Sequence, residues 1–404
     1  MSYLDKLLDG VEVKWKPLGE VADYEQPTKY LVNSTVYNDA YKTPVLTAGK
    51  TFILGYTDET DGIFEASKNP VVIFDDFTTA NKWVDFDFKA KSSAMKIITS
   101  KDENSTLIKY IYYWLNTLPS GLIEGDHKRQ WISNYCNKQI PIPCPENPEK
   151  SLAIQKEIVR ILDTFTELTT ELTTELTTEL TARKKQYDYY REELFNFDDK
   201  NIEHKLLGEI GEFQRGKRFV RTDITSDGVP CIHYGEMYTH YGTWADESKS
   251  FLSQKLVDNK KLRVAEKGDI VIVAAGETIE DIGKGTAWLS DKGVVIHDAC
   301  FSYRSQLNPK YVAYFTRTKR FHDQIKKHIS SGKISAINAN GLSKARIPIP
   351  SPEEQKRIVS ILDKFDTLTA SISEGLPKEI ELRQKQYEYY RDMLLTFPND
   401  NLKA

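Results

Sequence analysis

Cysteine is scarce in this sequence of 404 residues, and long apolar runs are missing. The cysteines lie too far apart for any C-x-x-C pair, so we expect reduced thiols rather than a disulfide framework. No stretch approaches about 18 consecutive apolar residues, and the opening MSYLD lacks the basic start and apolar run of a signal peptide. These absences argue against a secreted or membrane protein and predict a cytoplasmic one.

The motifs of catalysis are missing too. The sequence has no G-x-S-x-G, H-E-x-x-H or G-x-G-x-x-G, and His233 and His240 read as ordinary loop residues rather than metal ligands. The stretch GETIEDIGKGT at 276–286 is similar to a phosphate-binding loop but lacks the Ser or Thr after its lysine. Asp75 and Asp76 are adjacent on an expected strand and should point to opposite faces. We therefore expect a recognition protein without catalysis that binds no metal or cofactor of its own.

The sequence repeats itself, and the repeat organises the chain. QKEIVRILDTF at 155–165 recurs as QKRIVSILDKF at 355–365, and RKKQYDYYREELFNF at 183–197 recurs as RQKQYEYYRDMLLTF at 383–397. Apolar residues follow helical spacing through both blocks. A long helix with one apolar stripe needs a partner, and the other copy provides it. Two antiparallel helices related by a pseudo-twofold axis are therefore expected.

The regions between the helices have a mixed pattern. Runs of β-branched residues at 70–74 and 268–273 predict buried strands, while 107–118 and 309–329 have helical character. We expect an α+β fold in which two globular mixed α/β domains are separated by two long antiparallel helices that form a coiled coil. The expected segments are a first globular domain, a spacer helix, a second globular domain and a second helix, at residues 1–150, 151–199, 200–350 and 351–404.

One part of the first helix is unusual, because residues 166–181 read TELT four times. Its leucines recur every four residues, so the apolar stripe turns by about 40° per repeat around an α-helix. The repeat is either a tolerated spacer or a ruler, since each TELT changes the helix length by about 6 Å. The second helix contains Gly375 and Pro377 instead, and Pro377 should kink or restart it.

The net charge of −4 is unevenly distributed. Residues 1–150 carry 17 basic and 21 acidic side chains, whereas residues 200–350 carry 24 basic and 17 acidic ones. The second globular region is therefore basic, which suits contact with phosphate groups. Any single lysine there is better explained as part of a solvated surface with mixed charges.

The order of these features, present twice, resembles the specificity (S) subunits of type I restriction-modification systems over essentially the whole chain. The helical blocks that begin at Pro352 and Arg383 look like conserved regions of that family. The stretch PVVIFDDFTTANKWVDFDFKAKSSAMKII at 70–98 looks like one type of its target recognition domains, and GDIVIVAAGETIEDIGKGTAW at 268–288 looks like another.

The resemblance implies a non-catalytic subunit. Each target recognition domain would read one half of a split site in double-stranded DNA, and the helices would set the gap and dock two methyltransferase subunits. Those subunits would use S-adenosylmethionine to methylate adenine, and restriction or motor subunits using ATP and magnesium would join for cleavage. Two alternatives stay open: a regulatory mimic or scaffold that binds methyltransferase subunits without reading DNA and, less favoured, a metal-dependent nuclease built on Asp75 and Asp76.

Surface loops are expected to present the DNA contacts, and Arg, Lys, Asn and Gln are the usual readers of bases. The candidates in the first domain are Thr78, Thr79, Asn81, Lys82, Lys128, Arg129 and Gln130. The candidates in the second domain are Arg215, Lys217, Arg218, Arg221, Lys333, Asn338 and Asn340. By resemblance, the residues that face the methyltransferase subunits are Tyr189, Arg191, Tyr389 and Arg391. Coiled-coil contacts explain another set more simply, namely Tyr187, Tyr190, Tyr387 and Tyr390.

Overall fold

The chain folds into two compact units. The computed structural model describes residues 3–8, 10–48, 51–119, 129–198, 202–332, 334–370 and 374–397. Unit 1 consists of residues 1–174 and 381–404, and unit 2 consists of residues 175–380. Each unit therefore combines a globular part with stretches of two long helical blocks, and the expected mixed α/β fold with an internal repeat is confirmed.

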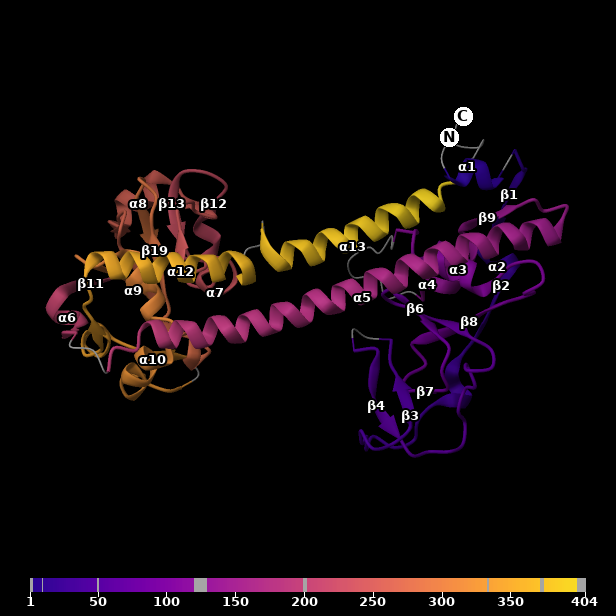
Figure 1. Ribbon diagram of the computed structural model, residues 1–404, viewed down its shortest axis with the longest axis horizontal. Helices are drawn as coiled ribbons and strands as arrows, with labels where there is room; N and C mark the ends of the chain where they lie inside the picture. Colours follow the sequence, from indigo (N-terminus) through magenta and orange to yellow (C-terminus); the bar gives the residue numbers. More distant parts are fainter. Residues whose placement is uncertain are drawn as a thin grey trace. The chain divides into compact units, whose positions relative to one another are not determined.

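The two helical blocks differ in continuity. Helix α5 (Pro148–Leu194) is unbroken over 47 residues (Figure 1). The second block is divided into α12 (Pro352–Ala370) and α13 (Gly375–Leu394). Pro377 lies in the first turn of α13, where a proline interrupts no intrahelical hydrogen bond, so the predicted restart is confirmed. The division at 150, 199 and 350 stays a prediction.

The strands of unit 1 form three sheets within its described residues. β1 pairs with β9, a four-stranded antiparallel sheet has the order β2-β8-β5-β6, and a three-stranded sheet has the order β4-β3-β7. The bounds are β1 Val13–Pro17, β2 Ala22–Glu25, β3 Thr43–Leu46, β4 Ile53–Thr57, β5 Val71–Asp75, β6 Asn81–Val84, β7 Lys89–Ala90, β8 Met95–Ser100 and β9 Gln139–Pro143.

Strand β5 explains why the run at 70–74 is apolar throughout. Val72 and Phe74 belong to one core cluster, and Val71 and Ile73 belong to another. Alternate residues of a strand point to opposite faces, so a strand with a core on each side needs apolar residues at every position.

Short helices complete unit 1, and α3 shares a core with the long helices. Tyr110 and Ile111 of α3 share a core with Ile158 and Leu162 of α5 and with Phe397, just after α13. The helical elements are α1 Tyr3–Leu8, α2 Leu18–Val21, α3 Ile108–Leu115 and α4 Gln130–Ser133, with 3₁₀ turns η1 Pro27–Tyr30 and η2 Tyr135–Asn137.

In the described part of unit 2, two five-stranded sheets carry most of the strands. Their orders are β11-β21-β17-β19-β14 and β12-β15-β13-β20-β16. The strands β18 and β22 form a separate two-stranded sheet, and so do β10 and β23. The bounds are β10 His204–Leu206, β11 Gly211–Arg215, β12 Ile224–Thr225, β13 Val229–Ile232, β14 Trp244–Ala245, β15 Ser250–Leu252, β16 Val264–Ala265, β17 Ile270–Val273, β18 Ala275–Gly276, β19 Gly285–Trp288, β20 Val294–Ile296, β21 Cys300–Ser305, β22 Ser335–Ala336 and β23 Arg346–Pro348.

Helix α9 of unit 2 has the same role as α3 in unit 1. Its buried Tyr311 and Phe315 share a core with Phe195, just after α5, and with Ile358 and Leu362 of α12. The short elements are α6 Leu207–Ile210, α7 Glu236–Thr239, α8 Gln254–Lys260, α9 Pro309–Phe315, α10 Lys319–Ile325 and α11 Ala339–Ser343, with 3₁₀ turns η3 Arg221–Asp223, η4 Ile279–Asp281 and η5 Lys326–His328. None of the helices in the described ranges combines the length and apolar character needed to cross a bilayer.

Stacked aromatic rings join the long helices within each unit. In unit 1 the rings of Phe165 and Tyr390 stack at 5.6 Å, and in unit 2 Phe365 stacks against Tyr187 at 5.8 Å and Tyr190 at 5.5 Å. The Thr166 hydroxyl of unit 1 also donates to the Tyr387 hydroxyl at 3.1 Å. The predicted contacts of these four tyrosines between the helices are thus confirmed.

The TELT leucines do not share one environment. Leu168 is 55% exposed, whereas Leu176 is only 8% exposed. A stripe that turns by about 40° per repeat cannot keep every leucine on one covered face, and the differing exposures agree with that spacing.

Gly375 gives a testable backbone prediction. It has φ +78°, and a Cβ there would overlap the carbonyl oxygens of Thr367 and Leu368. Gly375→Ala should lower the free energy of unfolding by about 1 to 3 kcal/mol, measured by denaturant unfolding. Gly242→Ala is the control, because a Cβ at Gly242 meets nothing within 4 Å. Equal stability of the two variants would contradict the assignment.

Candidate nucleic-acid interface

The basic segment at 215–221 begins at the last residue of β11, and its cationic side chains differ in whether they have hydrogen-bond partners. Arg215 donates from Nε to the Asp298 carbonyl at 2.8 Å and lies over the Phe301 ring, and Lys217 reaches the Lys260 carbonyl at 3.4 Å. The side chains of Arg218 and Arg221 are exposed and have no hydrogen bond or ion pair with any described residue. These two guanidinium groups are therefore the ones free to bind an anion.

Arg218 and Arg221 line a cavity of about 330 Å³ in unit 2. Its walls include the rings of His233, Tyr234 and His297. Cationic donors beside aromatic faces suit a ligand with phosphate and base character. The carboxylates of Glu277 and Asp298 also line the cavity, so its charge is mixed.

Burial favours the neutral form of the two histidines that line this cavity. Their rings lie 4.9 Å apart, and burial lowers the pKa of both. The backbone N–H of Gly235 donates to His233 Nδ1 at 3.3 Å, and that of Ala299 donates to His297 Nδ1 at 3.1 Å. The acidic neighbours Glu236 and Asp298 oppose these shifts without reversing them. We expected His233 to be an ordinary loop residue, but it lines the cavity.

The second predicted segment of unit 2 meets the same cavity through one residue. Ile334, 63% exposed, lines it beside Arg218 and Arg221. Asn338 caps α11, because its side-chain oxygen accepts from the Gly341 N–H at 2.8 Å, and Asn340 is exposed on α11. Lys333 lies outside the described residues. The structure thus brings two segments together that are more than a hundred positions apart in sequence.

In unit 1 the predicted residues after β5 form a tight turn. Asp75 accepts from the N–H groups of Phe77 and Thr78 and, at 2.6 Å, from the Thr78 hydroxyl, while Thr79 has φ +63°. Thr79 is buried, so it presents little surface for DNA contact. Thr78 and Lys82 are exposed. Asn81 is half-buried, and its side-chain oxygen has no partner among the described residues.

A local cationic cluster lies near this turn in unit 1. With the Gln26 amide oriented so that its oxygen faces cations, that oxygen accepts from Lys96 Nζ at 2.9 Å and from Arg129 at 3.2 Å. Lys96 is fully buried and lies 3.5 Å from Asp76. Burial lowers the pKa of Lys96, and the attraction of Asp76 opposes this shift. Gln26 and Arg129 are exposed, so unit 1 has a basic side chain at its surface here although its acidic residues outnumber its basic ones.

Gln130, which is also predicted to contact DNA, has a different place in the structure. Gln130 is buried at the start of α4, where Asp76 accepts from the Gln130 and Trp131 backbone N–H groups. The carboxylate of Asp76 thus has a role in holding α4, and that of Asp75 holds the turn. Lys128 lies outside the described residues.

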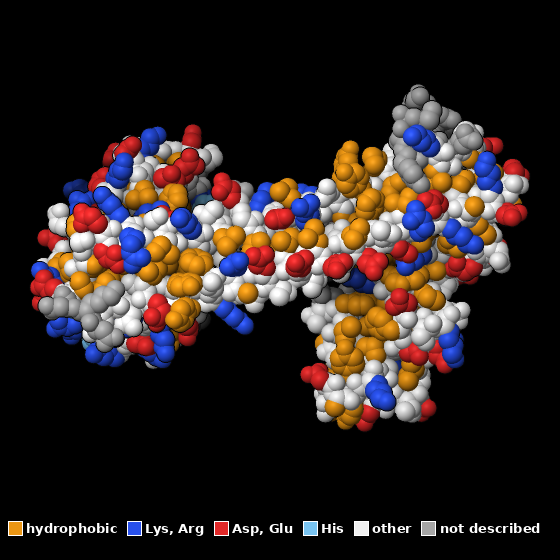
Figure 2. Space-filling view, viewed as in Figure 1, with side chains coloured by type: hydrophobic (Ala, Val, Ile, Leu, Met, Phe, Trp, Pro, Cys, Tyr) orange, Lys and Arg blue, Asp and Glu red, His pale blue; other side chains and the backbone are white. Residues whose placement is uncertain are grey.

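Surface charge on unit 2 is intermixed on the visible face. Figure 2 shows lysine and arginine side chains next to acidic ones over this unit rather than one continuous basic patch. Its excess of basic residues is thus not gathered on that face, and the free arginines of the cavity have to be identified residue by residue.

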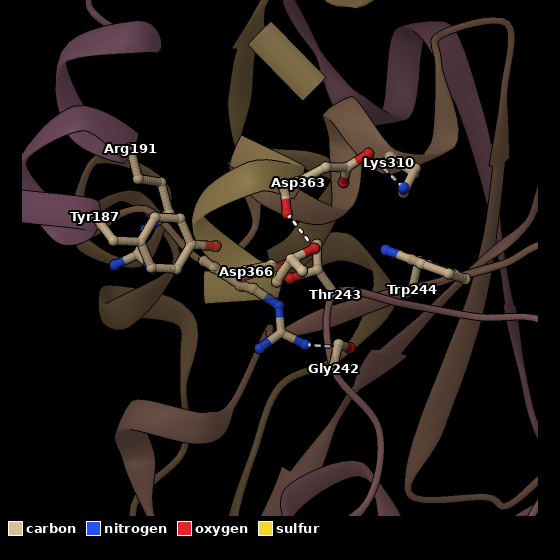
Figure 3. Close-up of a pocket in the computed structure, with 10 residues that line it drawn as sticks. Tyr187, Arg191, Gly242, Thr243, Trp244, Lys310, Asp363 and Asp366 are labelled. Atoms are coloured by element: carbon tan, nitrogen blue, oxygen red, sulfur yellow. Dashed lines mark hydrogen bonds and ion pairs between the residues drawn. The ribbon is translucent and has the colours of Figure 1, made fainter. Parts of the chain in front are cut away.

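A larger cavity, of about 580 Å³, lies in unit 2 where the globular part meets α5 and α12 (Figure 3). Tyr187 and Arg191 come from α5, Asp363 and Asp366 from α12, and Lys310 from α9. The cavity is lined by both basic and acidic side chains, so their charges partly neutralise one another.

The four residues predicted to face a partner differ in exposure. Tyr189 is 61% exposed and Tyr389 is 65% exposed, so both tyrosines present a large apolar ring to solvent. Arg191 lies over the Tyr187 ring and pairs with Asp188 at 2.8 Å, and Arg391 pairs with Asp392 at 2.7 Å. The two tyrosines are therefore the more accessible members of the predicted set.

Comparison with known proteins places the chain in a family. The family model for the "Type I restriction modification DNA specificity domain" matches residues 10–182 and 199–382. The EcoR124I/EcoR124II type I restriction enzyme specificity subunit of Escherichia coli is 53% identical over 98% of each chain. A putative type I restriction enzyme specificity subunit of Haemophilus influenzae is 34% identical over 98% of each. A chain solved in work on complex assembly and conformational transition of the type I restriction-modification system has a TM-score of 0.62 at 16% identity, over 95% of this chain and 97% of that one.

The burial of His297 should make the free energy of unfolding depend on pH. Because burial lowers the pKa of His297 in the folded chain, the unfolded chain takes up a proton more readily below its ordinary pKa of about 6.5. The free energy of unfolding should therefore fall as the pH decreases through that value. His297→Gln should flatten this dependence, measured as denaturant midpoints between about pH 7.5 and 5.5. An equal pH slope in both proteins would contradict the prediction.

Proposed function

The chain belongs to the family of type I restriction-modification DNA specificity subunits, and we propose that each of its two units reads one half of a split DNA site. Catalysis in such a system lies in partner subunits. The observation that carries the proposal is the pairing of two unlike globular parts with one repeated helical frame. A repeated frame holds two reading surfaces in equivalent positions, while different surfaces read different half-sites.

The reading surface of unit 2 is centred on the smaller cavity. Arg218 and Arg221 supply cationic donors whose side chains have no partner among the described residues, and His233 and Tyr234 supply rings. An arginine that is free of partners can bind the O6 and N7 acceptors of guanine or a phosphate. Within the described ranges, Arg215 and Lys217 have hydrogen-bond partners and the side chains of Arg218 and Arg221 have none, which supports this role for the latter two.

The reading surface of unit 1 is centred on Gln26 and Arg129, with Thr78 and Lys82 on the neighbouring turn and strand. Since two cations already bind the Gln26 oxygen, its NH₂ group is the part left to meet DNA. Such a group donates to an acceptor on a base edge or a phosphate. This local cluster lets an acidic unit contact DNA.

The helices have two roles in this proposal. Exposed Tyr189 and Tyr389 would dock two methyltransferase subunits that use S-adenosylmethionine, and restriction subunits using ATP and magnesium would join the same complex. The length of α5 would set the gap between the half-sites. A protein with this role works beside chromosomal DNA, so we place it in the cytoplasm. A mimic that never reads DNA is disfavoured by the free arginines of unit 2.

Arg218→Ala tests the reading surface of unit 2. In complex with methyltransferase subunits, this variant should bind the target about tenfold more weakly, the effect expected for loss of one arginine contact with a base. Discrimination should relax in one half-site only. Binding is measured on the wild-type target and on targets altered in each half.

The matched control is Arg357→Ala on α12, because Arg357 is exposed and already paired with Glu354 at 2.7 Å. Its affinity should equal that of the wild type. Unchanged affinity and an unchanged salt slope for Arg218→Ala would remove Arg218 from the interface.

Deleting one TELT, residues 170–173, tests the role of α5. The deletion shortens the helix by about 6 Å and turns it by about 40°, whereas one base pair advances 3.4 Å and turns by roughly 35°. The gap should shorten by about one or two base pairs with both half-sites unchanged. Sequencing of methylated sites measures this, and adding one TELT should lengthen the gap. A constant gap in both variants would refute the ruler.

A further inference from the structure

Each unit contains the same small cluster where a short helix meets a long one. The sequence K-Y-x-x-Y occurs in α3 as Lys109, Tyr110 and Tyr113, and again in α9 as Lys310, Tyr311 and Tyr314. The lysine of the motif pairs with an aspartate of the long helix: Lys109 with Asp163 at 3.0 Å, and Lys310 with Asp363 at 2.6 Å.

The second tyrosine of the motif binds the same aspartate. The Tyr113 hydroxyl donates to Asp163 Oδ1 at 2.5 Å, and the Tyr314 hydroxyl donates to Asp363 Oδ1 at 2.7 Å. Burial raises the pKa of both tyrosines, so their hydroxyls stay protonated donors. One carboxylate thus holds a cation and a hydroxyl from the same short helix.

The first tyrosine and a glutamine extend the match. The Tyr110 hydroxyl donates to the Pro141 carbonyl at 2.7 Å, and the Tyr311 hydroxyl donates to the Pro348 carbonyl at 3.0 Å. Gln155 of α5 accepts from the Leu107 N–H, and Gln355 of α12 accepts from the Asn308 N–H, both at 2.9 Å. The short helix is therefore fixed to its long helix, and to the strand that precedes the long helix, by the same set of directional bonds in both units.

The two globular parts have different folds, but each places a tryptophan over this cluster. A tryptophan ring lies against the lysine in each unit, Trp83 at 5.0 Å from Lys109 and Trp244 at 4.3 Å from Lys310. Trp83 belongs to β6 of an antiparallel sheet, whereas Trp244 belongs to β14, which pairs in parallel with β19. Two different folds thus place an indole on the same cation, which favours the ammonium by cation–π attraction.

The cluster restricts the orientation of the short helix on the long helix and adds little to the free energy of unfolding. Lys109 and Asp163 have side chains 32% and 38% exposed, and ion pairs with such access to water contribute little to folding. Apolar contacts between α9 and α12 are non-directional and allow small rotations. Charge-assisted hydrogen bonds to a fixed carboxylate narrow those rotations, because they depend on angle as well as distance.

We propose that Lys109, Tyr113 and Asp163 in unit 1, and Lys310, Tyr314 and Asp363 in unit 2, are positioning residues that fix the angle of each reading surface on the helical frame. We call each set the clasp of its unit. The inference rests on the proposed function, because an angle matters only if both units read DNA at a set gap. Loss of a clasp should widen the range of gaps without changing either half-site.

The test uses the full chain co-expressed with its methyltransferase subunits. Methylated-site sequencing first gives the wild-type target, and a DNA library then presents both half-sites at a series of gap lengths. Asp363→Asn, which keeps the shape of the side chain, and Lys310→Met should each raise methylation at neighbouring gaps about tenfold relative to the preferred gap, the factor for one charge-assisted bond. Lys109→Met should do the same through unit 1.

Two controls separate positioning from simple loss of stability. Lys310→Arg keeps the charge beside Trp244 and should retain the single gap of the wild type. Lys267→Met removes an exposed ion pair with Asp291 elsewhere in unit 2 and should also change nothing. A variant that only loses stability methylates all gaps less, with their ratio unchanged.

The outcomes are distinct. A wild-type complex that methylates no split site overturns the proposed function. A wild type with one gap, together with Asp363→Asn and Lys109→Met variants that keep that gap ratio, overturns the clasp alone.

Discussion

Coverage of one apolar stripe on α5 is the constraint on which the rest of this chain depends. A helix of 47 residues gains most of its stability from the surfaces that cover it, not from its own hydrogen bonds. In unit 1 the cover comes from α3 and α13, and in unit 2 it comes from α9 and α12. The repeated helical blocks supply the same aromatic rings in both places, namely Phe165 with Tyr390 and Phe365 with Tyr190.

This frame leaves the remaining surface free to differ. Unit 2 gathers arginines and histidines around a cavity, while unit 1 holds a glutamine and an arginine over a buried lysine. Both solutions give cationic donors without an excess of positive charge over the whole chain. The net charge of −4 is therefore a poor guide to DNA contact, because a few oriented donors decide it.

The frame could be predicted from the sequence because it rests on local periodicity and on repetition. The helices, their aromatic contacts and the restart near Pro377 follow from spacing alone. The reading surfaces follow from long-range neighbours instead: Lys96 and Gln26 meet only through the sheet, and Thr79 is buried by a turn that its sequence does not reveal. The clasp was readable as K-Y-x-x-Y in both units, but its spacing of 201 residues differs by one from that of the helical blocks.

The central claim is that two independent reading surfaces share one frame. The most direct measurement exchanges residues 202–346 for the corresponding segment of another family member and sequences the methylated sites of the resulting complex. One half-site should change to that of the donor, while the other half-site and the gap stay as they were. A change in both half-sites, or in neither, would contradict the account.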